Sequence, residues 1–298
     1  MISYALSDSA AFSPYMTPAL ADAFRNSKFQ NVEVTMLPFV EESEDALQSR
    51  SLTRQLLKEG AIRSASVHLP FFGGGQLWDP SLLDEDQRKG VTARIAKLIR
   101  DNADIMAPMA TLHASHEPPM EEHPARIDQV CRSIEELVPL AEEFNFSINV
   151  EYLPRTCIGN SVEELQKIVS RFDSRHVGIC FDVNHIMNRY KELPDMITEL
   201  APRIRSFHIS DYDGVDELHW IPGQGINDWC EVMRRIKAID HDVLLILETT
   251  YQLAGRPNRK ADPVFAIRQN ENACWFLENC DTIIAAQSQF KIPGNFTV

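Results

Sequence analysis

The sequence lacks the cysteine arrangements that mark a zinc module or a disulfide-stapled fold. Its six cysteines are scattered, and none belongs to a CxxC pair or to a short-spaced cluster with histidine. Reduced thiols in a cytoplasmic protein are the simplest interpretation. The first residues include no basic segment followed by an apolar one, and no run approaches 18 apolar residues. We therefore expect neither a secretory signal nor a membrane span.

Positive charge is also scarce. The chain has 29 Lys and Arg against 43 Asp and Glu, so its formal net charge is −14. Nucleic-acid-binding proteins usually carry a basic surface, because much of their affinity comes from neutralising phosphates. We therefore expect a small-molecule partner and no nucleic acid. Hydrophobic residues make up 44% and charged residues 24% of the 298 residues, which is ordinary for a globular protein with one large core.

Short apolar runs alternate along the chain with longer amphipathic segments. The runs are almost continuously apolar, which is typical of strands buried on both faces of a parallel sheet. The eight predicted strands are residues 2–6, 31–37, 64–69, 109–114, 148–153, 177–183, 204–210 and 243–250.

The segments between these runs have helical periodicity and recognisable helix ends. Thr17-Pro18 and the capping box Ser161-Val-Glu-Glu164 mark two helix starts. The other predicted helices are residues 43–60, 84–103, 122–144, 193–201, 227–239 and 262–286. Strict alternation of eight strands with about eight helices predicts an α/β fold, a single (β/α)8 barrel over residues 1–298 with an irregular tail from about 287.

Six consecutive predicted strands, the third to the eighth, end in a side chain that can bind a metal. Taken singly, each is readily explained as the first solvated residue after an apolar run. Taken together, they lie at the strand ends where barrel enzymes place their chemistry. The six are His68, His113, Glu151, Asp182, His208 and Glu248.

Four of these side chains suit one task. Glu151, Asp182, His208 and Glu248 offer hard oxygen and borderline nitrogen ligands without a thiolate. This set suits one divalent metal ion, and the ligand types alone leave Mn²⁺, Mg²⁺, Co²⁺ and Zn²⁺ open. An open coordination position would accept substrate oxygens.

Several short motifs resemble the xylose isomerase-like barrel superfamily over about residues 30–252. That superfamily includes sugar and sugar-phosphate isomerases and epimerases, inosose dehydratases and endonuclease IV. The motifs are VHLPF (67–71), NVEYLPR (149–155), CFDVNH (180–185), FHISDYDG (207–214), HWIPGQG (219–225) and LET (247–249).

The resemblance implies roles for individual residues. In the ketose 3-epimerases of the superfamily, the residues matching Glu151, Asp182, His208 and Glu248 hold the metal, and the one matching His185 contacts the substrate. The implied reaction is proton transfer beside a carbonyl through a metal-stabilised ene-diolate. Glu151 and Glu248 would then be the catalytic pair, one removing the proton and the other returning it.

The remaining candidates are assigned to substrate binding. For Arg155, a contact with an anionic group and a surface position are both open. Glu33 is expected either as a buried polar partner or as an ordinary strand residue, and the acidic residues of the 211–226 loop are expected to be solvated. The substrate-binding candidates are His68, His113, His185, His219, Arg155 and Trp220.

Four functions fit these residues. The first is a metal-dependent sugar or sugar-phosphate isomerase or epimerase, and the second is an inosose-type dehydratase on the same metal site. The third is an endonuclease IV-like hydrolase, although Glu217 stands where the Asp-x-His pair of that enzyme has aspartate. The fourth is a binding barrel without activity. A homodimer is expected only because dimers are common.

Overall fold

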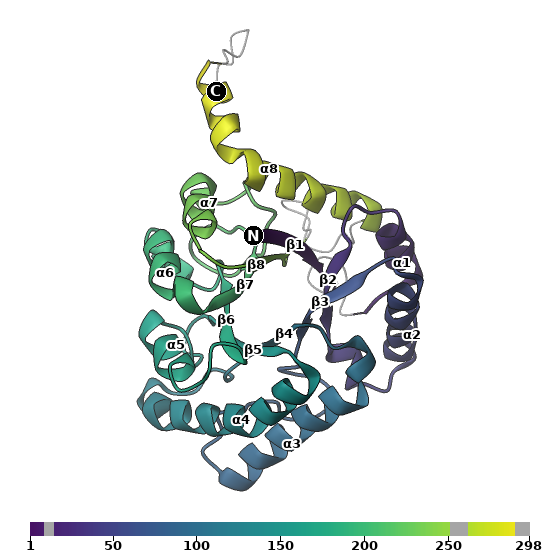
Figure 1. Cartoon of the computed structure of the whole chain (residues 1–298), viewed down its shortest axis with the longest axis vertical. Coiled ribbons are helices and arrows are strands. Elements are labelled where there is room, and N and C mark those ends of the chain that lie inside the picture. The colour runs from purple at the N-terminus through teal and green to yellow at the C-terminus, as the bar shows by residue number, and fades with distance from the viewer. Residues whose placement is uncertain (9–14, 251–261, 290–298) are drawn as a thin grey trace.

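The computed structural model describes residues 1–8, 15–250 and 262–289, with side chains to residue 286. Eight strands pair in parallel, each with the next, and β8 closes the ring on β1 (Figure 1). This confirms the predicted (β/α)8 barrel. The strands are β1 Ile2–Ser7, β2 Asn31–Thr35, β3 Arg63–His68, β4 Met109–Leu112, β5 Ser147–Glu151, β6 Val177–Asp182, β7 Ile204–Ile209 and β8 Val243–Leu247.

Helices surround the barrel, and the carboxyl-terminal part of the last one extends past its wall (Figure 1). The α-helices are α1 Pro18–Arg25, α2 Glu44–Glu59, α3 Glu85–Asp101, α4 His123–Phe144, α5 Val162–Val169, α6 Leu193–Leu200, α7 Trp229–Lys237 and α8 Pro263–Gln289. Single 3-10 turns cover Leu37–Phe39, Ala103–Ile105, Met120–Glu122, Met187–Arg189 and Ala201–Arg203. No helix in the described ranges is both long and apolar enough to cross a membrane.

Side-chain caps begin the helices where the sequence predicted them. The Thr17 hydroxyl accepts the backbone N–H of Leu20, and Pro18 occupies the first helical position. Ser161 caps α5, but the predicted capping box does not close. Glu164 instead accepts the backbone N–H of Gly159, a bond that holds the loop before the helix.

Several strands are shorter than predicted. β5 ends at Glu151 and β8 at Leu247, whereas the apolar runs predicted ends at 153 and 250. Tyr152 and Leu153 are nevertheless buried, and Tyr152 still contacts β6, where its N–H donates to the Cys180 carbonyl and its ring packs against Phe181. Apolar sequence therefore reports burial and overestimates the length of the strand. α8 reaches Gln289, so it includes the first three residues of the predicted tail, and residues 290–298 lie outside the described ranges.

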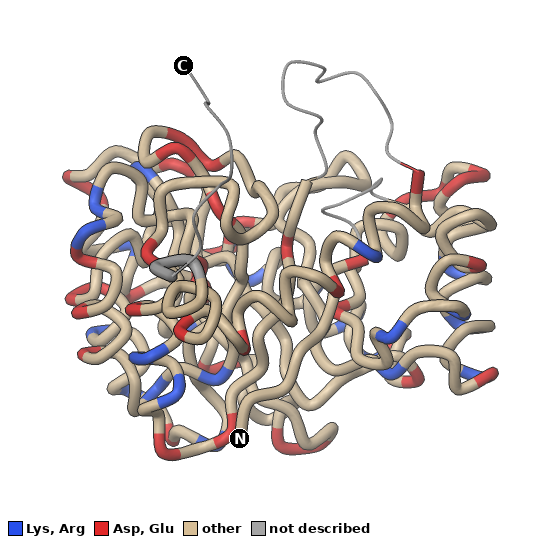
Figure 2. The backbone as a smooth tube through the Cα atoms, turned by 90° about the horizontal axis from the view of Figure 1, so that it is seen from above, with Lys and Arg blue, Asp and Glu red and all other residues tan. Residues whose placement is uncertain are grey.

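The barrel interior is part apolar and part polar. A small apolar cluster of Ala5, Leu244 and Ile246 is separate from the larger core between barrel and helices. Elsewhere polar side chains meet inside the ring, as where Asn149 Nδ2 donates to Ser206 Oγ at 3.4 Å. The N-terminus lies at the lower end in the side view of Figure 2, opposite the rim where the strands end.

Candidate metal centre

The six strand-end residues gather at one rim of the barrel. All eight strands are parallel, so their carboxyl ends meet at the same end of the ring. Four of the six lie within a strand at or beside its last residue, and two come directly after a strand. In chain order they are His68, His113, Glu151, Asp182, His208 and Glu248.

The four predicted ligands lie together. Glu151, Asp182, His208 and Glu248 each offer one atom, and these atoms lie within 4.8 Å of one another. His208 Nδ1 is 3.1 Å from Glu151 Oε1 and 3.1 Å from Glu248 Oε2. Three of the four are buried, and the side chain of Glu248 is 16% exposed. The set is compact enough for one cation to contact all four.

Two oxygens of this cluster, Glu151 Oε2 and Asp182 Oδ2, are buried without a hydrogen-bond partner among the described residues. The other oxygen of Asp182, Oδ1, accepts the backbone N–H of Asn184 at 2.6 Å. Leaving a buried acceptor unpaired costs about 1–3 kcal/mol, and more when it is charged. A divalent cation among these four ligands would give both oxygens a partner, so the donor set and the geometry both fit a metal.

Histidines control the charge of the cluster. Burial opposes ionisation of Glu151, but His113 and His208 outweigh it and hold the pKa of its carboxyl well below the usual value. Burial raises the pKa of Asp182. His68 is itself buried, yet Glu151 beside it raises the pKa of its imidazole to about 9. The glutamate at the centre is therefore ionised, as a metal ligand must be.

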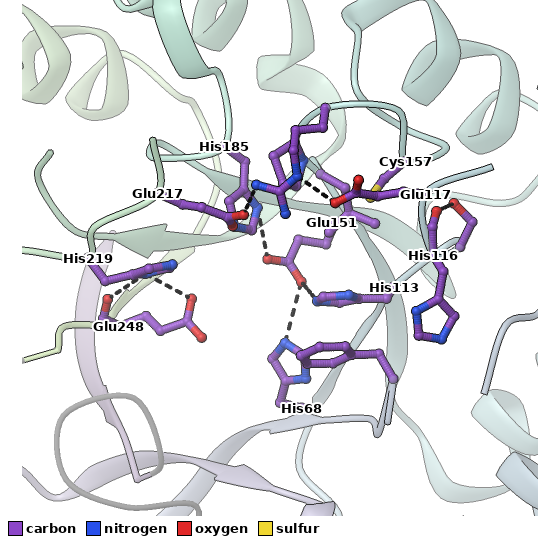
Figure 3. A pocket seen from close by; sticks show the side chains of 15 residues that line it. His68, His113, His116, Glu117, Glu151, Cys157, His185, Glu217, His219 and Glu248 are labelled. Atoms are coloured by element: carbon purple, nitrogen blue, oxygen red, sulfur yellow. Dashed lines mark hydrogen bonds and ion pairs between the residues drawn. The ribbon is translucent and has the colours of Figure 1, made fainter. Parts of the chain in front are cut away.

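A pocket of about 280 Å³ opens above the cluster (Figure 3). Glu151 and Glu248 line it, whereas Asp182 and His208 lie beneath and are not among its lining residues. Of the predicted substrate-binding residues, five line the pocket and Trp220 does not. The five are His68, His113, Arg155, His185 and His219.

Trp220 serves the loop after β7 through its backbone. Its N–H and carbonyl pair with those of Asp211 at 2.7 Å each, which forms an isolated antiparallel bridge. Its neighbour His219 adopts a positive φ of 48°. That conformation turns the His219 ring toward Glu248, where Nδ1 lies 3.1 Å from the backbone carbonyl oxygen (Figure 3).

Three loops meet around Arg155. Its guanidinium forms ion pairs with Glu117, from the loop after β4, and with Glu217, from the loop after β7. Glu217 Oε2 is also 3.0 Å from His185 Nε2. Both acidic partners bind the guanidinium, for which the sequence left open either a contact with an anionic group or a surface position. Glu217 was interpreted as a solvated charge, and this interpretation is wrong, because it lies between His185 and Arg155.

Asp211 was also expected to be solvated, and it is fully buried. Its Oδ1 accepts the N–H groups of Tyr212 and Asn227, and its Oδ2 accepts those of Gly223 and the Trp229 indole. Four donors therefore fasten the loop after β7 to one carboxylate. The signal in the sequence was the glycine-rich PGQG turn, which leaves backbone N–H groups free for an acceptor nearby.

Glu33 is a further residue whose role the sequence left open between a buried polar partner and an ordinary strand residue. It is fully buried in β2, and its Oε2 lies 3.1 Å from His208 Nε2. The inward alternation of its strand was the available signal. The partner was not predictable, because His208 is 175 residues away in the chain.

A sequence model described as the xylose isomerase-like TIM barrel matches residues 22–268. The chain belongs to this family. An uncharacterized protein from Methanocaldococcus jannaschii is 26% identical over 188 residues, which cover 61% of this chain and 63% of that one. A probable endonuclease 4 from Mycoplasmopsis pulmonis is 24% identical over 144 residues, covering 43% and 52%. The chain thus spans less than two thirds of the length of these curated relatives.

Solved structures of this family share the fold over nearly the whole chain. A D-psicose 3-epimerase in the presence of D-fructose matches with a TM-score of 0.72 at 17% identity, covering 92% of this chain and 97% of that one. A D-tagatose 3-epimerase-like protein matches with a TM-score of 0.70 at 20% identity, covering 93% and 99%. At these identities the likeness shows the fold.

Proposed function

We propose that this family member is a divalent-metal-dependent sugar or sugar-phosphate isomerase or epimerase. The observation that carries the proposal is the compact set of Glu151, Asp182, His208 and Glu248 beneath an open pocket, with one buried Asp182 oxygen unpaired. The structural neighbours named as ketose 3-epimerases support the same class of reaction.

The four residues would hold the metal, with Mn²⁺ favoured. When bound, the cation would polarise a substrate carbonyl and stabilise the negative charge of an ene-diolate. Asp182 and His208 anchor the site from below, since both are buried and neither lines the pocket. Glu151 and Glu248 face the pocket and can also meet the substrate.

This placement suits a proton relay between two glutamates. A carboxylate on one side of the substrate carbon removes a proton, and a carboxylate on the other side returns one. Glu151 projects from β5 and Glu248 follows β8, and both line the same pocket from different strands. The configuration of the substrate decides which of them acts first.

Several imidazoles also line the pocket, and those with a free ring nitrogen would bind substrate hydroxyls. Phe71 stacks on His113 with ring centroids 4.0 Å apart at 11°, which fixes the plane of that ring. The His185 ring is fixed at both nitrogens. Its Nδ1 lies 2.9 Å from the Tyr152 carbonyl oxygen, and its Nε2 lies 3.0 Å from Glu217 Oε2. Three carboxylates, those of Glu117, Asp216 and Glu217, already surround Arg155 and would compete with an anionic substrate group for its guanidinium.

The test is a panel of ketoses, keto-inositols and their phosphates, incubated with Mn²⁺ in deuterated water. Proton exchange with solvent at the carbon beside the carbonyl supports the proposal. Loss of water from a keto-inositol would instead identify the dehydratase alternative. Absence of exchange with every member, in protein shown to hold metal, contradicts the proposed reaction.

An endonuclease IV-like hydrolase has one structural observation in its favour. Asp182, His185 and His219 form a second group that could hold a metal, and a probable endonuclease 4 is among the relatives. The acidic Glu117 and Glu217 at the pocket oppose a phosphate backbone. Metal analysis separates the two functions, since one ion per chain favours the isomerase and three favour the nuclease.

A further inference from the structure

Glu33 is a fully buried acid inside the barrel, and it does not line the pocket. Its Oε1 accepts the hydroxyl of Ser66 at 2.8 Å and that of Thr111 at 3.2 Å. Those donors come from β3 and β4, the next strands around the ring. The carboxylate is thus fixed from two sides and is shielded from bulk solvent.

The third partner of this carboxylate is His208. Its Nε2 lies 3.1 Å from Glu33 Oε2 and 3.4 Å from Oε1. A carboxylate can accept hydrogen bonds at both oxygens, and the two hydroxyl groups donate to Oε1 of this one, which leaves Oε2 to accept from His208. His208 Nε2 must therefore carry a hydrogen and donate it to Glu33.

This assignment fixes the other side of the imidazole. A neutral ring with its hydrogen on Nε2 has a lone pair on Nδ1. That atom lies 3.1 Å from Glu151 Oε1 and from Glu248 Oε2, within the proposed ligand cluster. Two carboxylate oxygens around Nδ1 favour a cation there, which is a proton in the metal-free protein and a metal ion when one is bound. The orientation that Glu33 imposes is therefore the one that a metal requires.

We propose that Glu33 is a positioning residue for the metal centre. Glu33 holds His208 as the Nε2–H tautomer, with Nδ1 directed at the cation. The inference rests on the proposed function, because it assumes a metal among the four ligands. Carboxylates that accept the second N–H of a ligating histidine orient the ring and increase its basicity. Their loss typically weakens metal binding about 10–100-fold.

The main test measures Co²⁺ binding to the metal-free full chain by calorimetry at one fixed pH. Glu33→Gln keeps an oxygen that can accept from Nε2 but removes the charge, so we expect binding about 10-fold weaker than in the wild type. Glu33→Leu removes the acceptor, and we expect about 100-fold weaker binding. The visible spectrum of bound Co²⁺ should shift in Glu33→Leu, because the geometry of the His208 ligand changes.

Thr111→Val is the matched control. It alters the same buried layer and removes one bond to Glu33, yet it leaves the His208 contact in place. We expect its Co²⁺ affinity within about threefold of the wild type, below the range for loss of the histidine's own partner. Equal affinity of the wild type and both Glu33 variants overturns the inference, as does an equal loss in Thr111→Val and Glu33→Leu.

A second measurement needs no variant of Glu33 to fold. In Zn²⁺-loaded wild-type protein with ¹⁵N-labelled histidine, long-range proton–nitrogen spectra should show His208 with its hydrogen on Nε2. A hydrogen on Nδ1 overturns the inference whatever the variants do. If the wild-type protein binds neither Co²⁺ nor Zn²⁺, the proposed function fails and this inference fails with it. Metal binding with unaffected Glu33 variants leaves the proposed function standing.

Discussion

Two buried aspartates near the barrel rim have opposite surroundings. Asp211, just after β7, has both carboxylate oxygens saturated by four N–H donors. Asp182, the last residue of β6, accepts one backbone N–H, and its Oδ2 accepts no hydrogen bond in the part of the chain that is described, although His185 Nε2 lies 3.5 Å away. Both are completely buried. Burial alone therefore does not distinguish an acid that holds a loop from one that awaits a ligand.

The difference lies in what each carboxylate gains from the fold. A saturated buried carboxylate recovers the hydrogen bonds that it lost with water, so it stabilises the chain around it. A buried carboxylate with an unpaired oxygen destabilises the folded protein. Such a group is retained where another interaction, such as ligand binding, offsets this destabilisation. The barrel mouth, which contains Asp182, Glu151 and Glu248, is thus the region whose carboxylate oxygens remain available to bind a ligand.

The largest expected effect comes from the two glutamates that reach the pocket. Glu151→Gln and Glu248→Gln should each reduce solvent-deuterium exchange into a substrate by about 10²–10⁴-fold, because the amide cannot take or return a proton. Glu163→Gln, an exposed change in the first turn of α5, should exchange at the wild-type rate. Metal content is measured in each variant, so that loss of the ion is told apart from loss of the proton relay.

Exchange at the wild-type rate in either pocket variant would contradict the two-glutamate relay. Exchange lost together with the metal would assign that glutamate to binding the ion. Exchange lost with the metal retained would assign it to the proton transfer. Either result therefore separates binding of the ion from transfer of the proton at the barrel rim.

The series of residues at the rim was predictable from sequence. Each apolar run from the third to the eighth ends in a residue that can bind a metal, and parallel strands carry their ends to the same side of the sheet, so local pattern and topology together place Glu151, Asp182 and His208 in one cluster. The fold followed from the same alternation. Strand ends were less predictable, because Tyr152 and Leu153, which follow the end of β5, are as buried as the residues within the strand.

Contacts between distant segments could not be predicted in this way. Glu33 meets His208 only because the closed barrel brings β2 and β7 across from each other. Glu217 meets Arg155 and His185 only because three loops fold over one pocket. Because the chain is rich in acidic residues, Glu33 and Glu217 could not be distinguished in the sequence from acids that are exposed to solvent. Their partners are set by tertiary structure, which no local pattern records.

Asp182→Asn tests the aspartate that has an oxygen without a hydrogen bond. The metal affinity should fall by about 100-fold or more, beyond the usual effect of a residue that only supports a ligand. The free energy of unfolding of the metal-free protein should be unchanged or higher, because burial raises the pKa of Asp182 and its ionised form is unfavourable in the fold. Metal titration and urea unfolding measure the two quantities. A clear loss of metal-free stability would show that the carboxylate serves the fold.

Asp211→Asn is the smaller and opposite change. The amide of asparagine presents N–H hydrogens on one side where the carboxylate accepted from the Trp229 indole or from backbone N–H groups, so at least one buried donor loses its partner. The free energy of unfolding should fall by about 1–3 kcal/mol in urea, while the metal affinity of the folded protein stays close to that of the wild type. A variant with unchanged stability and weakened metal binding would reverse the assignment of the two aspartates. The two acids would then differ by their distance from the pocket and not by the saturation of their oxygens.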